Sequence, residues 1–449
     1  MSKTPIAAII LAAGRGTRMK SDLHKVLHPI AGRPMLFHLL DSINRLKPEI
    51  KVVVAGDRRE QLEAALKGSG AAIAFQEEQL GTAHAALQAK EAFSGFDGNV
   101  LVCFGDVPFL RTETVRRLCN ALKDEVMVSV LGFRPEDAAA YGRIVTDGRS
   151  RIVKMVEFKD ADEKEAKVNL CNSGVMVVHS DNIWRLLESV GNDNAAGEYY
   201  LPDVVTNALA EGHVAMVTET GEDEVAGVNR RSELARMEDN WQERRRKQAM
   251  DGGASMIAPE TVFFSHDTSI GRDVMIEPNV FFGPGVSIAN KVTIHGFSHI
   301  EGATICEGAS VGPFARLRPG AVLEEGSKVG NFVEMKKTTL GAGAKASHLT
   351  YLGDATVGAG ANIGAGTITC NYDGHFKYRT VIGAGAFIGS NSALVAPVKI
   401  GKGAIVAAGS TVTADVMDGE LRLVRAEQSV KPGWADRFND AMRKKKAGK

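Results

Sequence analysis

The C-terminal half of the chain carries a six-residue repeat that leaves few folds open. Beyond residue 256, aliphatic or aromatic residues recur six apart, and Gly often follows them, as in IGRDV, IGAGA and IGKGA. Such a hexad is the signature of a parallel β-helix, in which each short strand stacks on the one before it. Flat sides of such a helix commonly pack against identical chains, so we expect an oligomer. The series slips once before Val311, and its members are Ile270, Ile276, Phe282, Ile288, Ile294, Ile300, Val311, Leu317, Leu323, Val329, Ile382, Ile388, Leu394, Ile400, Val406 and Val412.

The N-terminal half has a different pattern of hydrophobic residues. From residue 1 to about 227, β-branched runs such as KVVVAGD and NVLVCFGD alternate with amphipathic stretches such as RREQLEAALKG. This alternation predicts a mostly parallel sheet with helices on both faces, whose ligand crevice lies at the carboxyl ends of the strands. Residues 228–250 contain no Gly or Pro and predict a linker helix. We therefore expect domains at 1–227 and 251–449, the second ending in a basic tail.

Charge and cysteine content exclude several classes of function. The 54 Lys and Arg residues balance the 54 Asp and Glu residues, so no global field attracts nucleic acid or an anionic membrane. The five cysteines include no CxxC pair for zinc or redox chemistry, which fits reduced thiols in a cytoplasmic protein. No apolar stretch reaches ~18 residues, so neither a signal peptide nor a membrane span is expected.

The stretch LAAGRGTRMKSDLHKVL, after the first predicted strand, has the features of an anion site. It lacks the GK[ST] ending of a P-loop and the third glycine of a dinucleotide fingerprint. Its two glycines, Gly14 and Gly16, would let backbone N–H groups approach a phosphate, while Arg15, Arg18 and Lys25 concentrate positive charge. This combination favours a nucleotide site over a plain turn.

Longer motifs carry a family resemblance. LAAGRGTRM with DLHKVL resembles the signature of sugar-1-phosphate nucleotidyltransferases, and QLGTAHA, FGDVP, YGRIV, VEFKD and CNSGV follow in that family's order. With its hexapeptide half, nearly the whole chain is similar to the bacterial bifunctional N-acetylglucosamine-1-phosphate uridyltransferases and glucosamine-1-phosphate N-acetyltransferases. The resemblance implies an α/β fold with a Rossmann-like nucleotidyltransferase domain, a linker helix and a left-handed parallel β-helix. His24 departs from it, since many members have Pro there.

The resemblance implies two reactions that make UDP-N-acetylglucosamine, a precursor of peptidoglycan and lipopolysaccharide. The C-terminal domain would transfer an acetyl group from acetyl-CoA to glucosamine-1-phosphate. The N-terminal domain would then join N-acetylglucosamine-1-phosphate to the uridylyl group of UTP, releasing pyrophosphate, with Mg²⁺ as cofactor. Members are cytoplasmic homotrimers whose acetyltransferase sites form between neighbouring chains, and neither nucleic acid nor membrane is an expected partner.

The family's uridyltransferase residues map onto this chain position by position. Asp106 and Asn229 match the Mg²⁺ ligands, although Asp106 also suits a turn cap and Asn229 suits the N-cap of the linker helix. Arg18 and Lys25 match the phosphate contacts. The remaining UTP and UDP-sugar contacts map to Leu11, Ala12, Ala13, Gly14, Gln76, Gly81, Thr82, Gly142, Glu157 and Asn172.

The stretch KASHLTYLG interrupts the hexads and contains His348. A histidine in a repeat domain is more often a surface residue than a catalyst, and we assign His295 and His299 to that class. His348 differs because its surroundings resemble the family's acetyltransferase site. Acetyl transfer requires the substrate's ammonium to lose a proton, and histidine titrates near neutrality, so the resemblance makes His348 the general base.

The other acetyltransferase residues are also implied by the resemblance. The sugar phosphate would be bound by Arg318, Lys336 and Lys377, and the sugar by Tyr351 and Asn362. The acetyl group would lie near Asn371 and Tyr372, and the rest of acetyl-CoA would contact Ala365, Ser390, Ala408 and Arg425.

Two other functions stay open from the sequence. The chain could be a nucleotidyltransferase whose β-helix serves only assembly or regulation, but the polar set around His348 argues against this. It could also be a non-enzymatic β-helix binding protein, against which Arg18, Lys25, Asp106 and Asn229 argue. The tail RKKKAGK is expected to be disordered and has no assigned role.

Overall fold

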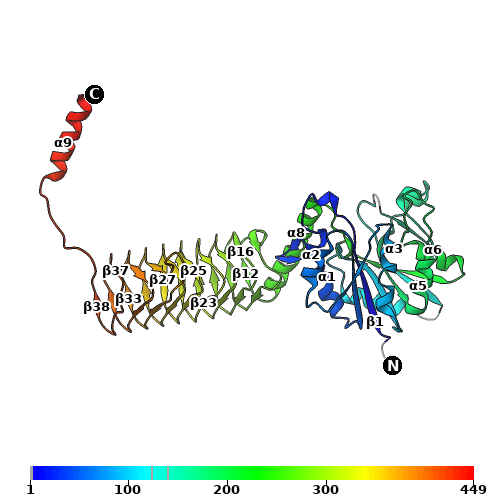
Figure 1. Cartoon of the computed structure of the whole chain (residues 1–449), viewed down its shortest axis with the longest axis horizontal. Helices are drawn as coiled ribbons and strands as arrows, with labels where there is room; N and C mark the ends of the chain where they lie inside the picture. Colours follow the sequence, from blue (N-terminus) through cyan, green and yellow to red (C-terminus); the bar gives the residue numbers. More distant parts are fainter. Residues whose placement is uncertain (1–3, 123–124, 139–140, 449) are drawn as a thin grey trace. The chain divides into compact units, whose positions relative to one another are not determined.

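The computed structural model describes residues 4–122, 125–138 and 141–448, which form two compact units, Met1–Arg244 and Arg245–Lys449 (Figure 1). Helix α8 (Arg231–Asp251) occupies most of the predicted linker and has residues in both units. No helix of the described ranges has the length and hydrophobicity needed to cross a membrane.

The N-terminal unit is built on a nine-stranded sheet with the strand order β11-β7-β10-β6-β1-β4-β5 and the pair β8-β9 attached to β10. Strand β1 pairs in parallel with both β4 and β6, whereas β10 runs antiparallel to β6 and β7. The predicted mostly parallel sheet is therefore present. Its strands are β1 Ile6–Ala12, β4 Ile50–Ala55, β5 Ala72–Phe75, β6 Asn99–Phe104, β7 Val126–Phe133, β8 Arg143–Thr146, β9 Ile152–Val156, β10 Cys171–His179 and β11 Val214–Thr220.

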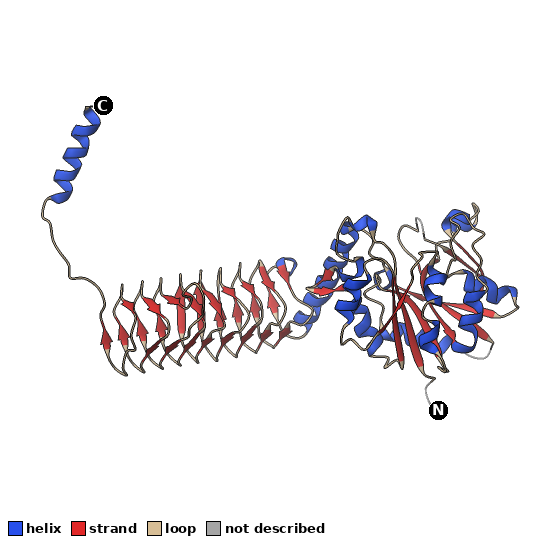
Figure 2. Cartoon of the chain, in the orientation of Figure 1, coloured by secondary structure: helices blue, strands red, loops and turns tan. Residues whose placement is uncertain are grey.

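Helices cover both faces of this sheet (Figure 2). Alternation along β1 sends Ala7 and Ile9 into one hydrophobic core and Ala8 and Ile10 into the other, as expected for a strand buried on both sides. Chain order reverses between β1 and β6, so their carboxyl ends open a crevice. The helices are α1 Met35–Asn44, α2 Arg59–Leu66, α3 Thr82–Leu87, α4 Thr112–Ala121, α5 Ser180–Glu188, α6 Asp203–Ala210 and α7 Glu222–Val225. A small hairpin pairs β2 Pro29–Ile30 with β3 Arg33–Pro34.

The C-terminal unit is a parallel β-helix made of three sheets. The first contains β12 Ser255–Met256, β15 Met275–Ile276, β18 Thr293–Ile294, β21 Ser310–Val311, β24 Lys328–Asn331, β27 Lys345–His348, β30 Asn362–Ile363, β33 Phe387–Ile388, β36 Ile405–Val406 and β38 Leu421–Arg422. The second contains β13 Val262–Phe263, β16 Val280–Phe282, β19 His299–Ile300, β22 Arg316–Leu317, β25 Glu334–Lys336, β28 Tyr351–Gly353, β31 Ile368–Cys370, β34 Ala393–Val395 and β37 Thr411–Val412. The third contains β14 Ser269–Ile270, β17 Ser287–Ile288, β20 Ala303–Ile305, β23 Ala321–Leu323, β26 Thr339–Leu340, β29 Ala355–Val357, β32 Thr380–Ile382 and β35 Val398–Ile400.

The hexad residues from Ile276 onward form the interior of this β-helix, whereas Ile270, in the third sheet's first strand, is only half-buried. Ile288 pairs in register with Ile305, and Ile305 with Leu323, all of them buried. The slip in the hexad series has a simple cause: Ile305 follows Ile300 after five residues, so one side of that coil is a residue shorter. Stacking continues because the next interior residue, Val311, is back in register with Ile294.

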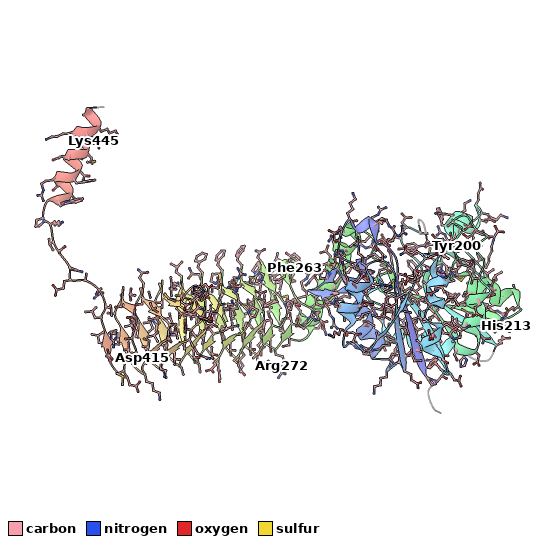
Figure 3. The ribbon with its side chains drawn as sticks, viewed as in Figure 1. Tyr200, His213, Phe263, Arg272, Asp415 and Lys445 are labelled. Carbon is pink, nitrogen blue, oxygen red and sulfur yellow. The ribbon has the colours of Figure 1, made fainter. Side chains whose placement is uncertain are left out.

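The expectation of a disordered tail is wrong. Residues Trp434–Ala447 form helix α9, and none of its side chains is buried. Its side chains, Lys445 among them, are exposed (Figure 3). The sequence from Trp434 onward lacks Gly and Pro until Gly448, which allows the helix to form.

Candidate active sites

Two adjoining cavities open at the carboxyl ends of β1 and β6. The first has a volume of about 400 Å³ and the second about 340 Å³. Their shared lining consists of Thr82, Phe104, Asp106, Glu198 and Asn229. Two ligands bound there would therefore meet at the side chains of Asp106 and Asn229.

Most of the predicted uridine and phosphate residues line the first cavity. They are Leu11, Ala12, Ala13, Gly14, Lys25, Gln76, Gly81 and Thr82. Gly81 has a φ of +124°, and a Cβ there would collide with the backbone of Tyr199, so only glycine lets this loop pack closely. Arg18 is an exposed residue of the turn Thr17–Met19 and is not part of this lining.

Lys25, Asp106 and Asn229 converge although they lie far apart in the sequence. The Lys25 ammonium forms an ion pair with Asp106 and donates a hydrogen bond to Asn229 Oδ1 at 3.2 Å. The N–H of Val228 donates to the carbonyl of Asp106 at 3.0 Å, and Asn229 N–H donates to Glu233 at 2.6 Å. These backbone bonds bring the two predicted metal ligands together. Their oxygens already face a cation, and a carboxylate with an amide oxygen suits Mg²⁺.

The second cavity contains the predicted sugar residues Gly142, Glu157 and Asn172. Asn172 N–H donates to the Gly142 carbonyl at 2.9 Å, and a Cβ on Gly142 would lie 3.2 Å from Glu157 Oε1. The three residues are therefore immediate neighbours. Burial raises the pKa of Glu157, and the carboxylates of Asp203 and Asp160 raise it further.

Sequence reasoning pointed to the charge of Arg15 but missed the lining residues Gln79, Glu198 and Tyr200. Arg15 and Gln79 both line the first cavity and are joined by a hydrogen bond of 2.6 Å from Arg15 Nε. Glu198 and Tyr200 come from a loop of residues 191–201 that approaches the cavities from outside the strand ends. The Arg15 charge was visible in the sequence, whereas nothing local marks Glu198 or Tyr200.

In the β-helix, His348 is paired with a residue that the sequence did not single out. His348 lies opposite Asn331 in the register of β24 and β27, and its Nδ1 is 2.5 Å from Asn331 Oδ1. An amide oxygen only accepts, so in the neutral imidazole the proton is on Nδ1 and Nε2 has the lone pair. The imidazole is exposed.

Three cations gather on the neighbouring face. The Lys377 ammonium, through a shared hydrogen bond and repulsion, and the Arg318 guanidinium lower the pKa of Lys336. Arg318 is also paired with Glu334 at 2.8 Å. Two of the cations, Arg318 and Lys336, are half-buried, and Lys377 is exposed. Mutual repulsion of cations without a built-in anion to match all three marks a site for an anionic ligand.

Tyr351 and Asn371 meet above Gly353. A Cβ at that position would lie far inside contact distance of Tyr351 Oη and 2.8 Å from Asn371 Nδ2. Asn371 donates to Asp354 at 2.6 Å and precedes a loop closed by the bridge between Tyr372 and Lys377. Asn362 lies on β30 in the sheet that carries His348.

The predicted acetyl-CoA residues form a ladder on successive coils. The Asn391 N–H donates to the Ala365 carbonyl and the Gly409 N–H to the Ser390 carbonyl, each at 2.8 Å. Arg425 Nη1 donates to the Ala408 carbonyl at 2.8 Å and so brings the last two members together. Ala365, Ser390 and Ala408 have small side chains, and Ser390, Ala408 and Arg425 are exposed.

Comparison with known proteins supports both halves. The family of MobA-like NTP transferase domains matches residues 8–192, and the bacterial transferase hexapeptide family (six repeats) matches residues 379–414. The Bifunctional protein GlmU of Sphingopyxis alaskensis is 65% identical over 99% of this chain and 98% of that protein. That of Novosphingobium aromaticivorans is 66% identical over 99% of each chain. The solved inositol-1-phosphate CTP transferase from T. maritima is 19% identical with a TM-score of 0.43, covering 53% of this chain and 98% of that one.

A nucleotidyltransferase sheet with cavities at its strand ends, followed by a hexapeptide β-helix, defines a two-domain transferase. The chain belongs to the family of bifunctional GlmU proteins. It is a bifunctional enzyme, a uridylyltransferase and an acetyltransferase, and the fold class and family predicted from its motifs are confirmed.

Proposed function

We propose that this enzyme makes UDP-N-acetylglucosamine from glucosamine-1-phosphate, acetyl-CoA and UTP, and so supplies peptidoglycan and lipopolysaccharide synthesis in the cytoplasm. The observation that carries the proposal is the pair of separate sites: joined cavities around Lys25 and Asp106 in one unit, and His348 with a cation cluster in the other. Each has the charge and hydrogen-bonding groups that its reaction requires. The domain limits we propose are 1–227, 228–250 and 251–449.

In the N-terminal unit, UTP would occupy the first cavity and N-acetylglucosamine-1-phosphate the second. A phosphate oxygen of the sugar attacks the α-phosphate of UTP, and the bond to pyrophosphate breaks. The reaction joins two anions, so the protein must neutralise charge and align the attack. Lys25, where the cavities meet, and Arg18, from the turn Thr17–Met19, are the proposed cations for this task.

Asp106 and Asn229 would hold Mg²⁺ at the same place, because their side-chain oxygens converge there. The ion would supply charge neutralisation at the phosphates when bound. Lys25 contacts both oxygens in the present arrangement, so its ammonium is held where the phosphates of both substrates would meet. The backbone N–H groups of the loop after β1 would contact the nucleotide, and Glu157 and Asn172 the acetylamino sugar.

In the C-terminal unit, His348 would act as the general base. The amine nitrogen of glucosamine-1-phosphate attacks the thioester carbonyl carbon, the C–S bond breaks, and coenzyme A leaves as the thiolate, which becomes the thiol by taking the proton that His348 has removed. The proton lost from nitrogen goes to His348 Nε2, which has the lone pair of the neutral ring because Nδ1 donates to Asn331. Arg318, Lys336 and Lys377 would bind the sugar phosphate, Tyr351 and Asn362 the sugar, and the ladder from Ala365 to Arg425, with Asn371 and Tyr372, the acetyl-CoA.

We further propose a homotrimer assembled through the β-helix. Phe297, Phe314 and Phe332 occupy one corner of successive coils, stack with ring centroids 5.0 and 5.1 Å apart, and are exposed. Leu349 continues this column and is 60% exposed. A continuous apolar column on a solvent-exposed surface favours contact with another copy of the chain.

The test measures both reactions on one preparation. Thiol release from acetyl-CoA with glucosamine-1-phosphate, and pyrophosphate release from UTP with N-acetylglucosamine-1-phosphate, are compared for the native enzyme and His348→Ala. The proposal expects the variant to lose thiol release and keep pyrophosphate release. Native enzyme without thiol release would reduce the function to nucleotidyl transfer, and loss of both reactions in a folded variant would refute separate sites.

A further inference from the structure

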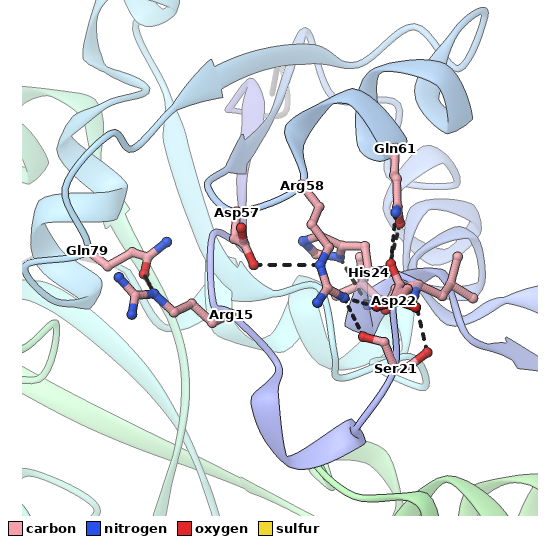
Figure 4. A network of polar contacts seen from close by, with 10 residues as sticks. Arg15, Ser21, Asp22, His24, Asp57, Arg58, Gln61 and Gln79 are labelled. Carbon is pink, nitrogen blue, oxygen red and sulfur yellow. Dashed lines mark hydrogen bonds and ion pairs between the residues drawn. The ribbon is translucent and has the colours of Figure 1, made fainter.

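The segment Ser21–His24, immediately before Lys25, is held by two side chains from the start of helix α2 (Figure 4). Arg58 Nη1 donates to the carbonyls of Ser21, at 2.6 Å, and Leu23, at 3.3 Å. Gln61 Nε2 donates to the Asp22 carbonyl at 2.9 Å, and Gln61 Oε1 accepts from the His24 N–H at 2.7 Å. A segment with no strand or helix of its own thus has four backbone groups satisfied by α2.

These two side chains are themselves fixed. Arg58 has a left-handed backbone with a φ of 55°, its guanidinium lies 3.7 Å from the Asp57 carboxylate, and its carbonyl accepts from the Gln61 N–H at 3.1 Å. Its side chain is 34% exposed. The pair therefore presents a preorganised surface rather than two mobile side chains.

Position 24 explains why this arrangement is possible. The N–H of His24 is the donor to Gln61, and the proline found there in many members of the family has no N–H. The hydrogen bond between His24 and Gln61 closes a loop of 37 residues, so no local motif reveals it.

His24 links the restrained segment to Lys25 through hydrogen bonds to the turn that Lys25 begins. Its Nδ1 accepts from the Val26 N–H at 3.4 Å, and its carbonyl accepts from the Leu27 N–H at 2.9 Å, so it caps the turn Lys25–Leu27. Lys25 is the first residue of that turn and reaches Asp106 and Asn229 with its ammonium. A shift of the segment before it would move the ammonium away from those two oxygens.

We propose that Arg58 and Gln61 are positioning residues for uridylyl transfer, which act by holding residues 21–24 so that Lys25 stays directed at Asp106 and Asn229. Neither residue lines the cavities, and both act through Lys25. The inference rests on the proposed phosphate-binding role of Lys25. It also places a determinant of catalysis on a helix that the family motifs do not include.

The test compares Gln61→Ala with Glu63→Ala, an exposed residue two positions along the same helix. Gln61→Ala should lower kcat for pyrophosphate release by about 10-fold or more, with a smaller change in the KM for UTP. The reason is that a displaced Lys25 ammonium stabilises the transition state, where negative charge develops, less well, while it affects UTP binding less. Glu63→Ala should match the native enzyme. Gln61→Glu keeps the acceptor for His24 but loses the donor to Asp22, so it should recover part of the loss.

Two further measurements test whether Gln61 acts on uridylyl transfer through Lys25. Thiol release from acetyl-CoA, measured on the same preparations, should stay at the native rate in every α2 variant and so reports intact folding and assembly. In a Lys25→Met background, Gln61→Ala should cause little further loss. An equal further loss there, or native kcat in Gln61→Ala alone, would overturn the inference, whereas native enzyme that fails to release pyrophosphate would instead refute the proposed function.

Discussion

The buried imidazole of His24 should make the N-terminal unit sensitive to acid. His24 is 3% exposed, and burial lowers its pKa from 6.5 to about 4. Its Nδ1 must stay unprotonated to accept the Val26 N–H. In the unfolded chain the same imidazole is expected to titrate near 6.5, so between these values the unfolded state binds a proton that the folded state does not.

The magnitude follows from the two pKa values. Above pH 6.5 His24 is neutral in both the folded and the unfolded state, so its titration does not change the free energy of unfolding. As the pH falls the difference grows, to about 2 kcal/mol at pH 5 and about 3 kcal/mol at pH 4, at roughly 1.4 kcal/mol per unit. The folded state is therefore destabilised in the window from pH 6.5 to 4, and the loss levels off below the folded pKa.

The assay compares the native enzyme with His24→Asn, whose amide oxygen can cap the same turn without titrating. Urea unfolding of the N-terminal unit, followed by the fluorescence of Trp184 and Trp241, gives the free energy of unfolding at pH 8 and pH 5. The difference between the two proteins should change by about 2 kcal/mol in favour of the variant on going to pH 5. A difference that stays constant with pH would refute a buried neutral His24.

Three further outcomes are expected. Asn331→Ala should lower kcat for acetyl transfer by roughly 10-fold to 100-fold, because His348 loses the acceptor that sets its tautomer, and pyrophosphate release should not change; an unaffected thiol-release rate would contradict the assigned tautomer. Gly353→Ala should displace Tyr351, whose hydroxyl occupies the space of the new methyl group, and raise the KM for glucosamine-1-phosphate in the same assay; a native KM would argue against a sugar contact. Phe282→Ala should destabilise the β-helix by roughly 3–5 kcal/mol in denaturant unfolding, since this ring is 1% exposed, and a loss below about 1 kcal/mol would mean that the coil collapses around the gap.

Local patterns predicted much of this molecule. The hexads predicted the β-helix because a stacked coil repeats one apolar position per side, and a period is visible in any single chain. The slip before Val311 was visible, but its cause, a short side ending at Ile305, required the register. The tail was misjudged because its charges dominate the composition, whereas Trp434 and Phe438, one helical turn apart and stacked, favour helix α9.

The site could be predicted only where motifs mark it. Lys25 and Asp106 belong to recognisable stretches, and the structure places them in contact. Asn331, Arg58 and Gln61 belong to no motif, because their partners His348 and the segment Ser21–His24 lie 17 to 39 residues away and only folding brings them together.

The features that the sequence determines and those that tertiary structure decides differ in the range over which their interactions act. The sequence alone determined which periods and charged loops the chain has, and hence its two kinds of unit and its two kinds of chemistry, since periodicity and glycine placement act over a few residues. Tertiary structure decided which nitrogen of His348 is free and what holds Lys25 in place. These depend on single hydrogen bonds between distant strands and helices, whose partners are selected by register and packing.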